Sequence, residues 1–142
     1  MAYFNKIGLL ILNGDKTKMM VCEPGRKYHN KKVTQYLMPG GQLEKDETDE
    51  QNLVREIKEE LDCEIYIQSL KLINEYTDVS AAGPDKDVMI RMYQGELIGK
   101  PKASSEIGAL HWIGKEHINN PKVSQIIKNK IIPDLIQKGI LK

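Results

Sequence analysis

Three glutamates, Glu56, Glu59 and Glu60, have a spacing that would let them act together in chemistry. On an α-helix, at about 100° per residue, they fall within an arc of about 100° on one face. Only Glu59 has a basic residue one helical turn away, Arg55, whereas Glu56 and Glu60 face like charge. Such pairs cost an isolated helix roughly 0.2 to 0.5 kcal/mol each. A hard divalent cation would turn this repulsion into attraction, and carboxylates without His or Cys suit Mg²⁺ or Mn²⁺ rather than zinc.

The element that carries these glutamates is predicted to be a helix over residues 48–61. Thr48 and Gln51 have the spacing of a capping box, which places the helix start beside the acidic residues 47–50. One apolar stripe is expected from residues that recur at spacings of one, three and four, namely Leu53, Val54, Ile57 and Leu61. An ion-paired structural helix without a ligand remains an alternative to a metal site.

Strands are predicted before this helix. Residues 3–12 are rich in β-formers and lead into Asn13-Gly14-Asp15, so residues 19–22 are expected to return as the second strand of a β-hairpin. A polar, basic loop over residues 24–32 and a short strand over residues 35–38 should follow. That strand is expected to stop at Pro39-Gly40-Gly41.

Further strands and a second helix are predicted after residue 61. A mixed sheet is the simplest account of the β-like segments at residues 65–73, 88–97 and 110–113, joined by loops such as Ala82-Gly83-Pro84. Asn120-Pro121 has the form of a helix start. We expect Pro133 to kink or divide this helix and Gly139 to end it.

Length and composition narrow the function classes. The 142 residues suit a single domain over residues 1–142, and the 21 Lys and Arg nearly balance the 20 Asp and Glu. Without a large basic field, polymeric nucleic acid is not an expected partner. Apolar runs are too short for a membrane span and no signal peptide is apparent, so we expect a cytoplasmic protein without membrane contact. Cys22 and Cys63 are expected to be reduced and packed.

The segment at residues 41–63 resembles the Nudix box. The matching positions are Gly41, Glu47, Arg55, Glu56, Ile57, Glu59 and Glu60, and Gly40-Gly41 matches the glycine pair of the family. Chance would produce the six non-aliphatic matches at a given position with a probability on the order of one in 10⁷. Two residues depart from the pattern, because Asp62 stands where glycine is usual and Cys63 where an aliphatic residue is usual.

This resemblance implies a fold and a set of roles. The fold would be of the α/β (α+β) class, a Nudix-type α/β/α sandwich with a mixed central sheet. Glu56, Glu59 and Glu60 would hold Mg²⁺, or alternatively Mn²⁺, together with the carbonyl oxygen of Gly40. Arg55 would form a supporting ion pair with Glu47 that orients the loop and the helix.

Further site residues are expected outside the acidic helix face. Glu59 and Glu106 are the two candidates for the general base that deprotonates water. Substrate phosphates could be met by basic residues of the loop before the box, Arg26, Lys31 and Lys32, and the substrate site should include Gly41. Trp112 is interpreted as core packing, and the three histidines as surface or packing residues.

The resemblance also implies an activity, the metal-dependent hydrolysis of a phosphoanhydride bond in a nucleoside diphosphate linked to another moiety. The chain length resembles that of the MutT-like group, so the narrower hypothesis is a nucleoside triphosphate, with an oxidised purine as one option, cleaved to the monophosphate and pyrophosphate. ADP-ribose and dinucleoside polyphosphates stay open as substrates. A catalytically silent nucleotide-binding or regulatory module is the alternative function. A homodimer is one option for the assembly, although no sequence pattern marks an interface.

Overall fold

The computed structural model describes the backbone of residues 2–80 and 83–142, and the side chains of residues 5–79 and 87–142. Its regular elements are β1 (Ala2–Leu10), β2 (Met19–Pro24), β3 (Gly40–Gln42), α1 (Asp49–Leu61), β4 (Glu64–Ser80), β5 (Gly83–Ile98), β6 (Ile107–Ile113), the 3₁₀ turn η1 (Lys115–His117), the π-helical turn η2 (Ile127–Ile131) and α2 (Ile132–Gln137). The predicted loop at residues 82–84 is only partly described, and there β5 already begins at Gly83.

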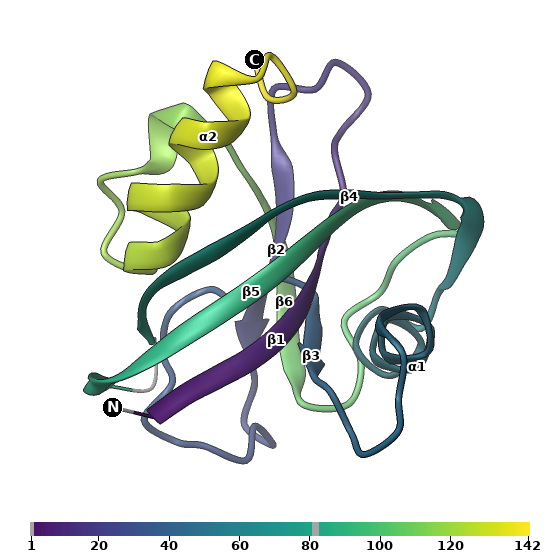
Figure 1. Ribbon diagram of the computed structural model, residues 1–142, viewed down its shortest axis with the longest axis horizontal. Helices are drawn as coiled ribbons and strands as arrows, with labels where there is room; N and C mark the ends of the chain where they lie inside the picture. The colour runs from purple at the N-terminus through teal and green to yellow at the C-terminus, as the bar shows by residue number, and fades with distance from the viewer. Residues whose placement is uncertain (1, 81–82) are drawn as a thin grey trace.

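The strands form two sheets. Four strands lie in the order β3-β1-β5-β4, with β1 parallel to β5 and the other neighbours antiparallel, while β2 and β6 form a separate antiparallel pair. The predicted mixed sheet is therefore confirmed for residues 65–73 and 88–97, whereas residues 110–113 belong to β6 and lie outside it. In Figure 1, α1 and α2 lie on opposite sides of the four-stranded sheet. Helices on both sides of a mixed sheet also agree with the expected α/β/α sandwich.

The predicted hairpin between the first two strands forms only at its turn, and the strands themselves do not pair. An isolated bridge joins Leu12 to Met19, the Asn13 amide donates to the Lys18 carbonyl at 3.0 Å, and the Met20 amide donates to the Ile11 carbonyl at 3.0 Å. A strand has two edges, and β1 uses one for β5 and the other for β3. Because neither edge of β1 is free, β2 pairs with β6 instead.

The strand before the acidic helix also lies later than predicted. Within residues 35–38 only an isolated bridge forms, between Leu37 and Cys22, and β3 begins at Gly40, where the strand was expected to stop. Gly40 has a φ of +125°, and a Cβ added there would lie 2.0 Å from the carbonyl oxygen of Ile7. Glycine therefore allows the close pairing of this segment with β1, which a larger residue would block.

The predicted helix and its capping box are confirmed in α1. The Thr48 hydroxyl accepts a hydrogen bond from the Gln51 amide at 3.1 Å, and the Gln51 side chain accepts one from the Thr48 amide at 3.0 Å. The helix buries Leu53, Ile57 and Leu61 completely. Val54, predicted to share this stripe, is 46% exposed because the buried face of the helix is narrower than the spacing suggested.

The second helical segment begins later than predicted. Asn120 accepts a hydrogen bond from the Lys122 amide at 2.9 Å in a turn, and helical residues start at 125. The π-helical turn η2 then precedes α2, whose first turn contains Pro133. Proline lacks the amide hydrogen that regular α-helical bonding requires, which fits a change of helix type at this point. Gly139 follows α2 with a φ of +72° and ends the helix as predicted.

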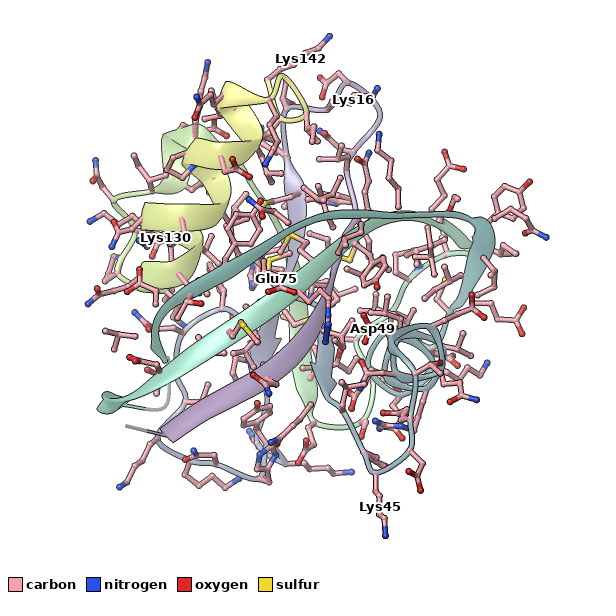
Figure 2. The ribbon with its side chains drawn as sticks, in the orientation of Figure 1. Lys16, Lys45, Asp49, Glu75, Lys130 and Lys142 are labelled. Atoms are coloured by element: carbon pink, nitrogen blue, oxygen red, sulfur yellow. The ribbon has the colours of Figure 1, made fainter. Side chains whose placement is uncertain are left out.

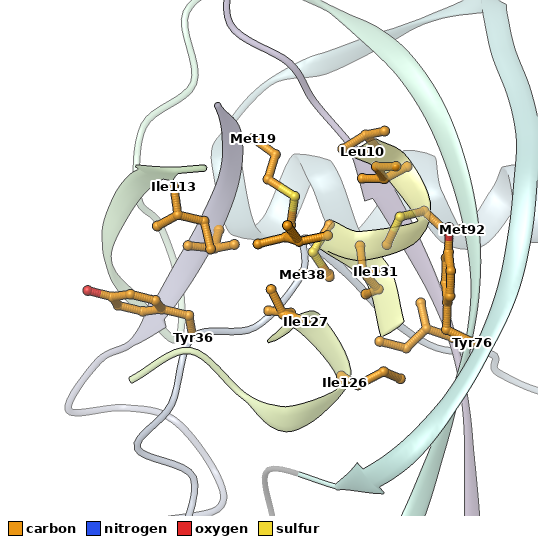
Figure 3. Packing of buried hydrophobic residues seen from close by; sticks show 14 of the residues in the cluster. Leu10, Met19, Tyr36, Met38, Tyr76, Met92, Ile113, Ile126, Ile127 and Ile131 are labelled. Carbon is orange, nitrogen blue, oxygen red and sulfur yellow. The ribbon is translucent and has the colours of Figure 1, made fainter. Parts of the chain in front are cut away.

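Two apolar clusters divide the core between the faces of β1. Ile7 and Leu9 pack with α1, whereas Leu10 belongs to the cluster that includes η2 and α2. Figure 3 shows this second cluster, in which Ile127 and Ile131 lie among side chains from the strands. Within the described part of the chain, no helix has the length and apolar character needed to cross a membrane.

The start of α1 is fixed to β5 by polar contacts. Asp49 accepts a hydrogen bond from the Tyr93 hydroxyl at 2.6 Å and lies 3.0 Å from the guanidinium of Arg91. Figure 2 labels Asp49 at the helix that lies beside the sheet. These contacts, together with the buried apolar stripe, hold the acidic face of α1 in a defined position relative to the sheet.

Candidate active site

A cavity of about 360 Å³ lies beside the acidic face of α1. One end of the cavity is charged, and its wall contains Lys6, Gly40, Gly41, Arg55, Glu56, Glu59 and Glu60. The other end is mainly apolar, and its wall contains Val33, Tyr36, Met38, Val88, Ile90, Ser124, Ile126 and Ile127. We call these the carboxylate end and the apolar end.

Glu60 is the most deeply placed carboxylate at the carboxylate end. Its Oε1 accepts a hydrogen bond from the Gly40 amide at 2.8 Å, which ties α1 to β3. Burial raises the pKa of Glu60 to about 8, with a further contribution from the negative charge of Glu56. The Gly40 amide and Lys6 oppose this rise but do not cancel it. A group with these properties gains from a nearby cation when it ionises.

Glu56 lies against the second glycine of the pair. A Cβ added at Gly41 would lie 2.5 Å from the Glu56 carboxylate, so a side chain at this position would require that carboxylate to move. Burial raises the pKa of Glu56, and the neighbouring Arg55 partly offsets the effect. The glycine pair thus serves two steric purposes, since Gly40 lets β3 approach β1 and Gly41 leaves space for Glu56.

The structure forms the ion pair expected between Arg55 and Glu47. Arg55 donates to Glu47 through Nε at 2.8 Å and through Nη2 at 3.0 Å, and its Nη1 donates to Glu56 at 2.9 Å. These hydrogen bonds lower the pKa of Glu47 to about 2. Asn52, which the sequence reading did not select, donates to Glu47 at 3.1 Å and to the Gln42 carbonyl at 3.0 Å. The sequence marked Asn52 in one way, as a polar residue on the buried side of an amphipathic helix.

Glu59 and Glu106, the two candidate bases, both lie on the cavity wall. The Glu59 side chain is 54% exposed and lies 3.7 Å from Arg55. Glu106, directly before β6, accepts a hydrogen bond from the His29 amide at 2.9 Å, and the His29 ring lies 3.2 Å from the same carboxylate. His29 was interpreted as a surface or packing residue, but it also lines the cavity.

The basic loop residues do not reach the cavity in this structure. Arg26 and Lys32 are exposed and lie outside its wall, whereas Lys31 lines a separate cavity of about 210 Å³. Trp112, interpreted as core packing, is 42% exposed on β6. It is also absent from the cavity wall, so neither a core role nor a base-stacking role is supported.

Lys6 is a cavity residue that the sequence reading missed. It lies within β1 and its side chain faces the cavity that holds Glu60 and Glu56. Burial lowers the pKa of Lys6, and the two glutamates oppose this effect. A lysine directly before the apolar residues 7–12 was a visible signal, but the direction of its side chain depends on which strands pair with β1.

The carboxylate end has the donor chemistry for a hard divalent ion. Glu56 and Glu60 supply oxygen ligands of the kind that Mg²⁺ and Mn²⁺ prefer, and burial raises the pKa of both carboxyl groups. Among the described residues, no three His, Cys, Asp or Glu side chains are gathered closely enough to hold a metal. Arg55 contacts Glu56 and Glu59 at 2.9 and 3.7 Å, so an ion would compete with this guanidinium for both carboxylates.

Comparison with known proteins agrees with this arrangement. The NUDIX domain family matches residues 3–135 of the chain. A comparison with curated proteins found no significant match. Among solved structures, the MutT protein from Methanosarcina mazei Go1 is similar with a TM-score of 0.77 at 16% identity, covering 96% of each chain.

Two further solved structures share the fold at low identity. The MutT NUDIX hydrolase from Burkholderia pseudomallei has a TM-score of 0.68 at 18% identity, covering 88% of this chain and 92% of that one. A bifunctional NMN adenylyltransferase/ADP ribose pyrophosphatase from Francisella tularensis, in complex with AMP and a Mn ion, has a TM-score of 0.62 at 20% identity. That match covers 96% of this chain but 42% of the larger protein.

Proposed function

The chain belongs to the Nudix family, and from this premise we propose that it is a magnesium-dependent pyrophosphohydrolase. Its substrate would be a nucleoside diphosphate linked to another moiety, and in the narrower proposal a nucleoside triphosphate, with an oxidised purine as one option. The products would then be a nucleoside monophosphate and pyrophosphate. The observation that carries the proposal is the meeting of Glu56 and Glu60 with the Gly40-Gly41 backbone at one end of a cavity.

The residues of the carboxylate end would have two roles, metal binding and positioning of the metal ligands. Glu56, Glu59 and Glu60, with the carbonyl oxygen of Gly40, would hold Mg²⁺, which supplies positive charge for the phosphate oxygens and acidifies bound water. Arg55 acts through its neighbours, because its two hydrogen bonds to Glu47 fix the loop before α1 against the helix. We therefore assign Arg55 and Glu47 to positioning rather than to contact with the substrate.

The proton of the attacking water needs an acceptor near the carboxylate end. Glu59 and Glu106 both line the cavity and remain the two candidates. Glu106 already accepts a hydrogen bond from the His29 amide, so its carboxylate is held in place by the loop that contains His29. Glu59 is more exposed and more free to turn. A comparison of kcat for Glu59→Gln and Glu106→Gln would separate the two.

The apolar end supports a substrate with a flat apolar group beside its phosphates. Val88 and Ile90 of β5 line this part of the cavity together with Ile126 and Ile127, and the buried Ser124 adds one hydroxyl. A nucleobase has an apolar face and polar edges that suit such a wall. The similarity of fold to two proteins named MutT supports the nucleoside triphosphate, whereas the ADP ribose pyrophosphatase of similar fold keeps ADP-ribose in the test set.

The proposal is tested by product release from a panel of canonical and oxidised nucleoside triphosphates, ADP-ribose and dinucleoside polyphosphates, each with Mg²⁺. The native chain should release pyrophosphate from a triphosphate, and Glu60→Gln should lower kcat at least about a hundredfold. Glu50→Gln is the matched control, because Glu50 is an exposed residue of the same helix outside the cavity wall. A clear preference for ADP-ribose would overturn the narrower proposal.

The same panel distinguishes an enzyme from a silent binding module. Negligible turnover by both the native chain and Glu60→Gln, with tight nucleotide binding in both, would favour the module. Thermal unfolding with and without Mg²⁺ tests the remaining alternative, in which α1 is an ion-paired structural helix that binds no metal. Specific binding to the folded state at about 100 times its Kd stabilises by about 2.7 kcal/mol, so an unchanged Tm would contradict a metal site.

A further inference from the structure

Lys6 occupies a defined place between the two ends of the cavity. In the sheet it lies between Gln42 of β3 and Ile90 of β5. Side chains alternate along a strand, and Ile7 and Leu9 pack with α1. Lys6 and Gly8 therefore face the other side, where the cavity includes both of them and Ile90.

The ammonium group of Lys6 has no direct partner among the described side chains. Among the side chains of residues 5–79 and 87–142, none forms an ion pair with it within 4.0 Å, and no hydrogen bond to its Nζ is found. Arg55, the other Lys or Arg on the cavity wall, is held by Glu47 and Glu56. Lys6 is thus the one basic side chain of this wall, among the described residues, that is free to meet a ligand.

A partly buried cation without a direct partner is costly, since it loses water contacts without gaining a hydrogen bond. Burial lowers the pKa of Lys6, while Glu60 and Glu56 favour its charged form from a distance. An anion that enters the cavity would supply the missing partner. The exposed Arg26 and Lys32, by contrast, lie outside the wall and keep their charges in water.

We propose that Lys6 is the phosphate-binding residue of this site, and that its Nζ donates hydrogen bonds to non-bridging phosphate oxygens of the substrate where the phosphate chain meets the apolar end. This inference rests on the proposed function. The position between Gln42 and Ile90 places the charge at the junction of the two ends, so that the group attached to the phosphates lies toward Ile90. The sequence predicted phosphate binding by the loop residues Arg26 and Lys32, and we assign that role to Lys6 instead.

The test is calorimetric binding of inorganic pyrophosphate at saturating Mg²⁺. Lys6→Met should weaken pyrophosphate binding by about 10- to 100-fold, the usual loss for a charge-assisted hydrogen bond, whereas Lys6→Arg should stay within about threefold of the native chain. Lys32→Met is the matched control and should leave binding unchanged. The Tm of each variant, measured without ligand, shows whether it folds, and Lys6→Gln provides a second neutral variant if Lys6→Met does not.

A purely structural role for Lys6 predicts different results. If Lys6 only offsets the charge of Glu60 and Glu56, Lys6→Met should change the affinity for Mg²⁺ alone and leave pyrophosphate affinity at saturating Mg²⁺ unchanged. That outcome, or equal weakening by Lys6→Met and Lys32→Met, would overturn the proposal.

The failure of this inference can be told from failure of the proposed function. If the native chain hydrolyses a nucleotide and Lys6→Met leaves both KM and pyrophosphate affinity unchanged, the role of Lys6 is wrong and the enzyme assignment stands. If no nucleotide is hydrolysed but pyrophosphate binding still depends on Lys6, the phosphate site stands and the hydrolase proposal falls. With an active enzyme, we expect Lys6→Met to raise KM more than Lys6→Arg does.

Discussion

The two ends of the cavity are built in different ways. The carboxylate end comes mainly from one stretch of chain, residues 40–60, in which local contacts fix the side chains, such as Gly40 with Glu60 and Arg55 with Glu47. The apolar end combines side chains from residues 33–38, from β5 and from residues 124–127. Its residues are far apart in sequence and meet only through the fold.

This difference separates the chemistry of the site from its selectivity. A locally built carboxylate end can keep its metal-binding potential while the rest of the chain diverges. The apolar end depends on how β5 and the segment before α2 are placed, so its shape can change without altering the acidic helix. We therefore expect changes at one end to affect metal binding and turnover, and changes at the other to affect which substrate is preferred.

The largest expected effect concerns the charge of Glu60 without metal. The unfolded chain releases this proton near pH 4.5, whereas the folded chain holds it until about pH 8. Between these values the folded state binds more protons, so its stability should fall as pH rises, by an amount on the order of 3 to 5 kcal/mol. Thermal unfolding of chelator-treated protein from pH 5 to pH 8.5 measures this fall.

Glu60→Gln is the control for this pH dependence, because other groups also titrate in the same range. The variant carries no titrating group at this position and should show a flatter curve than the native chain. Mg²⁺ should reduce the difference at high pH, since it binds the ionised form. Parallel curves for the two proteins would show that Glu60 is not buried as described.

The second effect tests the steric requirement at the carboxylate end. Gly41→Ala places a Cβ 2.5 Å from the Glu56 carboxylate, which must move away. We expect kcat with Mg²⁺ to fall by about 10- to 100-fold, because a displacement of this size misplaces a group that acts in the reaction. Gly14→Ala, where nothing lies within 4 Å of an added Cβ, should keep native kcat. Native activity in Gly41→Ala would contradict the role of Glu56.

The third effect addresses the apolar end. Val88→Leu extends a side chain into the part of the cavity assigned to the group beside the phosphates. One added methylene should raise KM for a nucleotide by about tenfold while leaving pyrophosphate binding at saturating Mg²⁺ unchanged. Val54→Leu, on the 46% exposed position of α1, is the control for the same chemical change. Equal loss of nucleotide and pyrophosphate affinity would contradict the division between the two ends.

The smallest effect concerns the end of α1. Asp62 adopts the left-handed conformation with a φ of 50°, in which glycine has no steric penalty. Asp62→Gly should raise the free energy of unfolding by up to about 1 kcal/mol and leave kcat unchanged. Denaturant unfolding measures the gain, and Asp62→Asn separates the loss of charge from the relief of backbone strain. A destabilised Asp62→Gly would show that the contacts with Lys58 and Lys102 outweigh the strain.

Local signals predicted α1 and its surroundings well. The capping box of Thr48 and Gln51 and the pair of Arg55 and Glu47 depend on residues close in sequence, so their geometry follows once the helix forms. The pairing of the first two strands failed as a prediction because turn residues do not reveal which partners compete for the edges of β1. Because the partners of β1 could not be predicted, the sequence also did not show that the Lys6 side chain points into the cavity.

The sequence by itself determined the acidic helix, the glycine pair before it and the family to which the chain belongs. All of these follow from residue types at fixed short spacings, where helix periodicity and the steric demands of glycine leave few alternatives. Tertiary structure decided that Lys6 lines the same cavity as the carboxylates, that Arg26 and Lys32 lie outside it, and that residues of β5 and residues 124–127 share its apolar end. These features depend on long-range strand pairing and packing, whose free energies come from many weak contacts between distant segments.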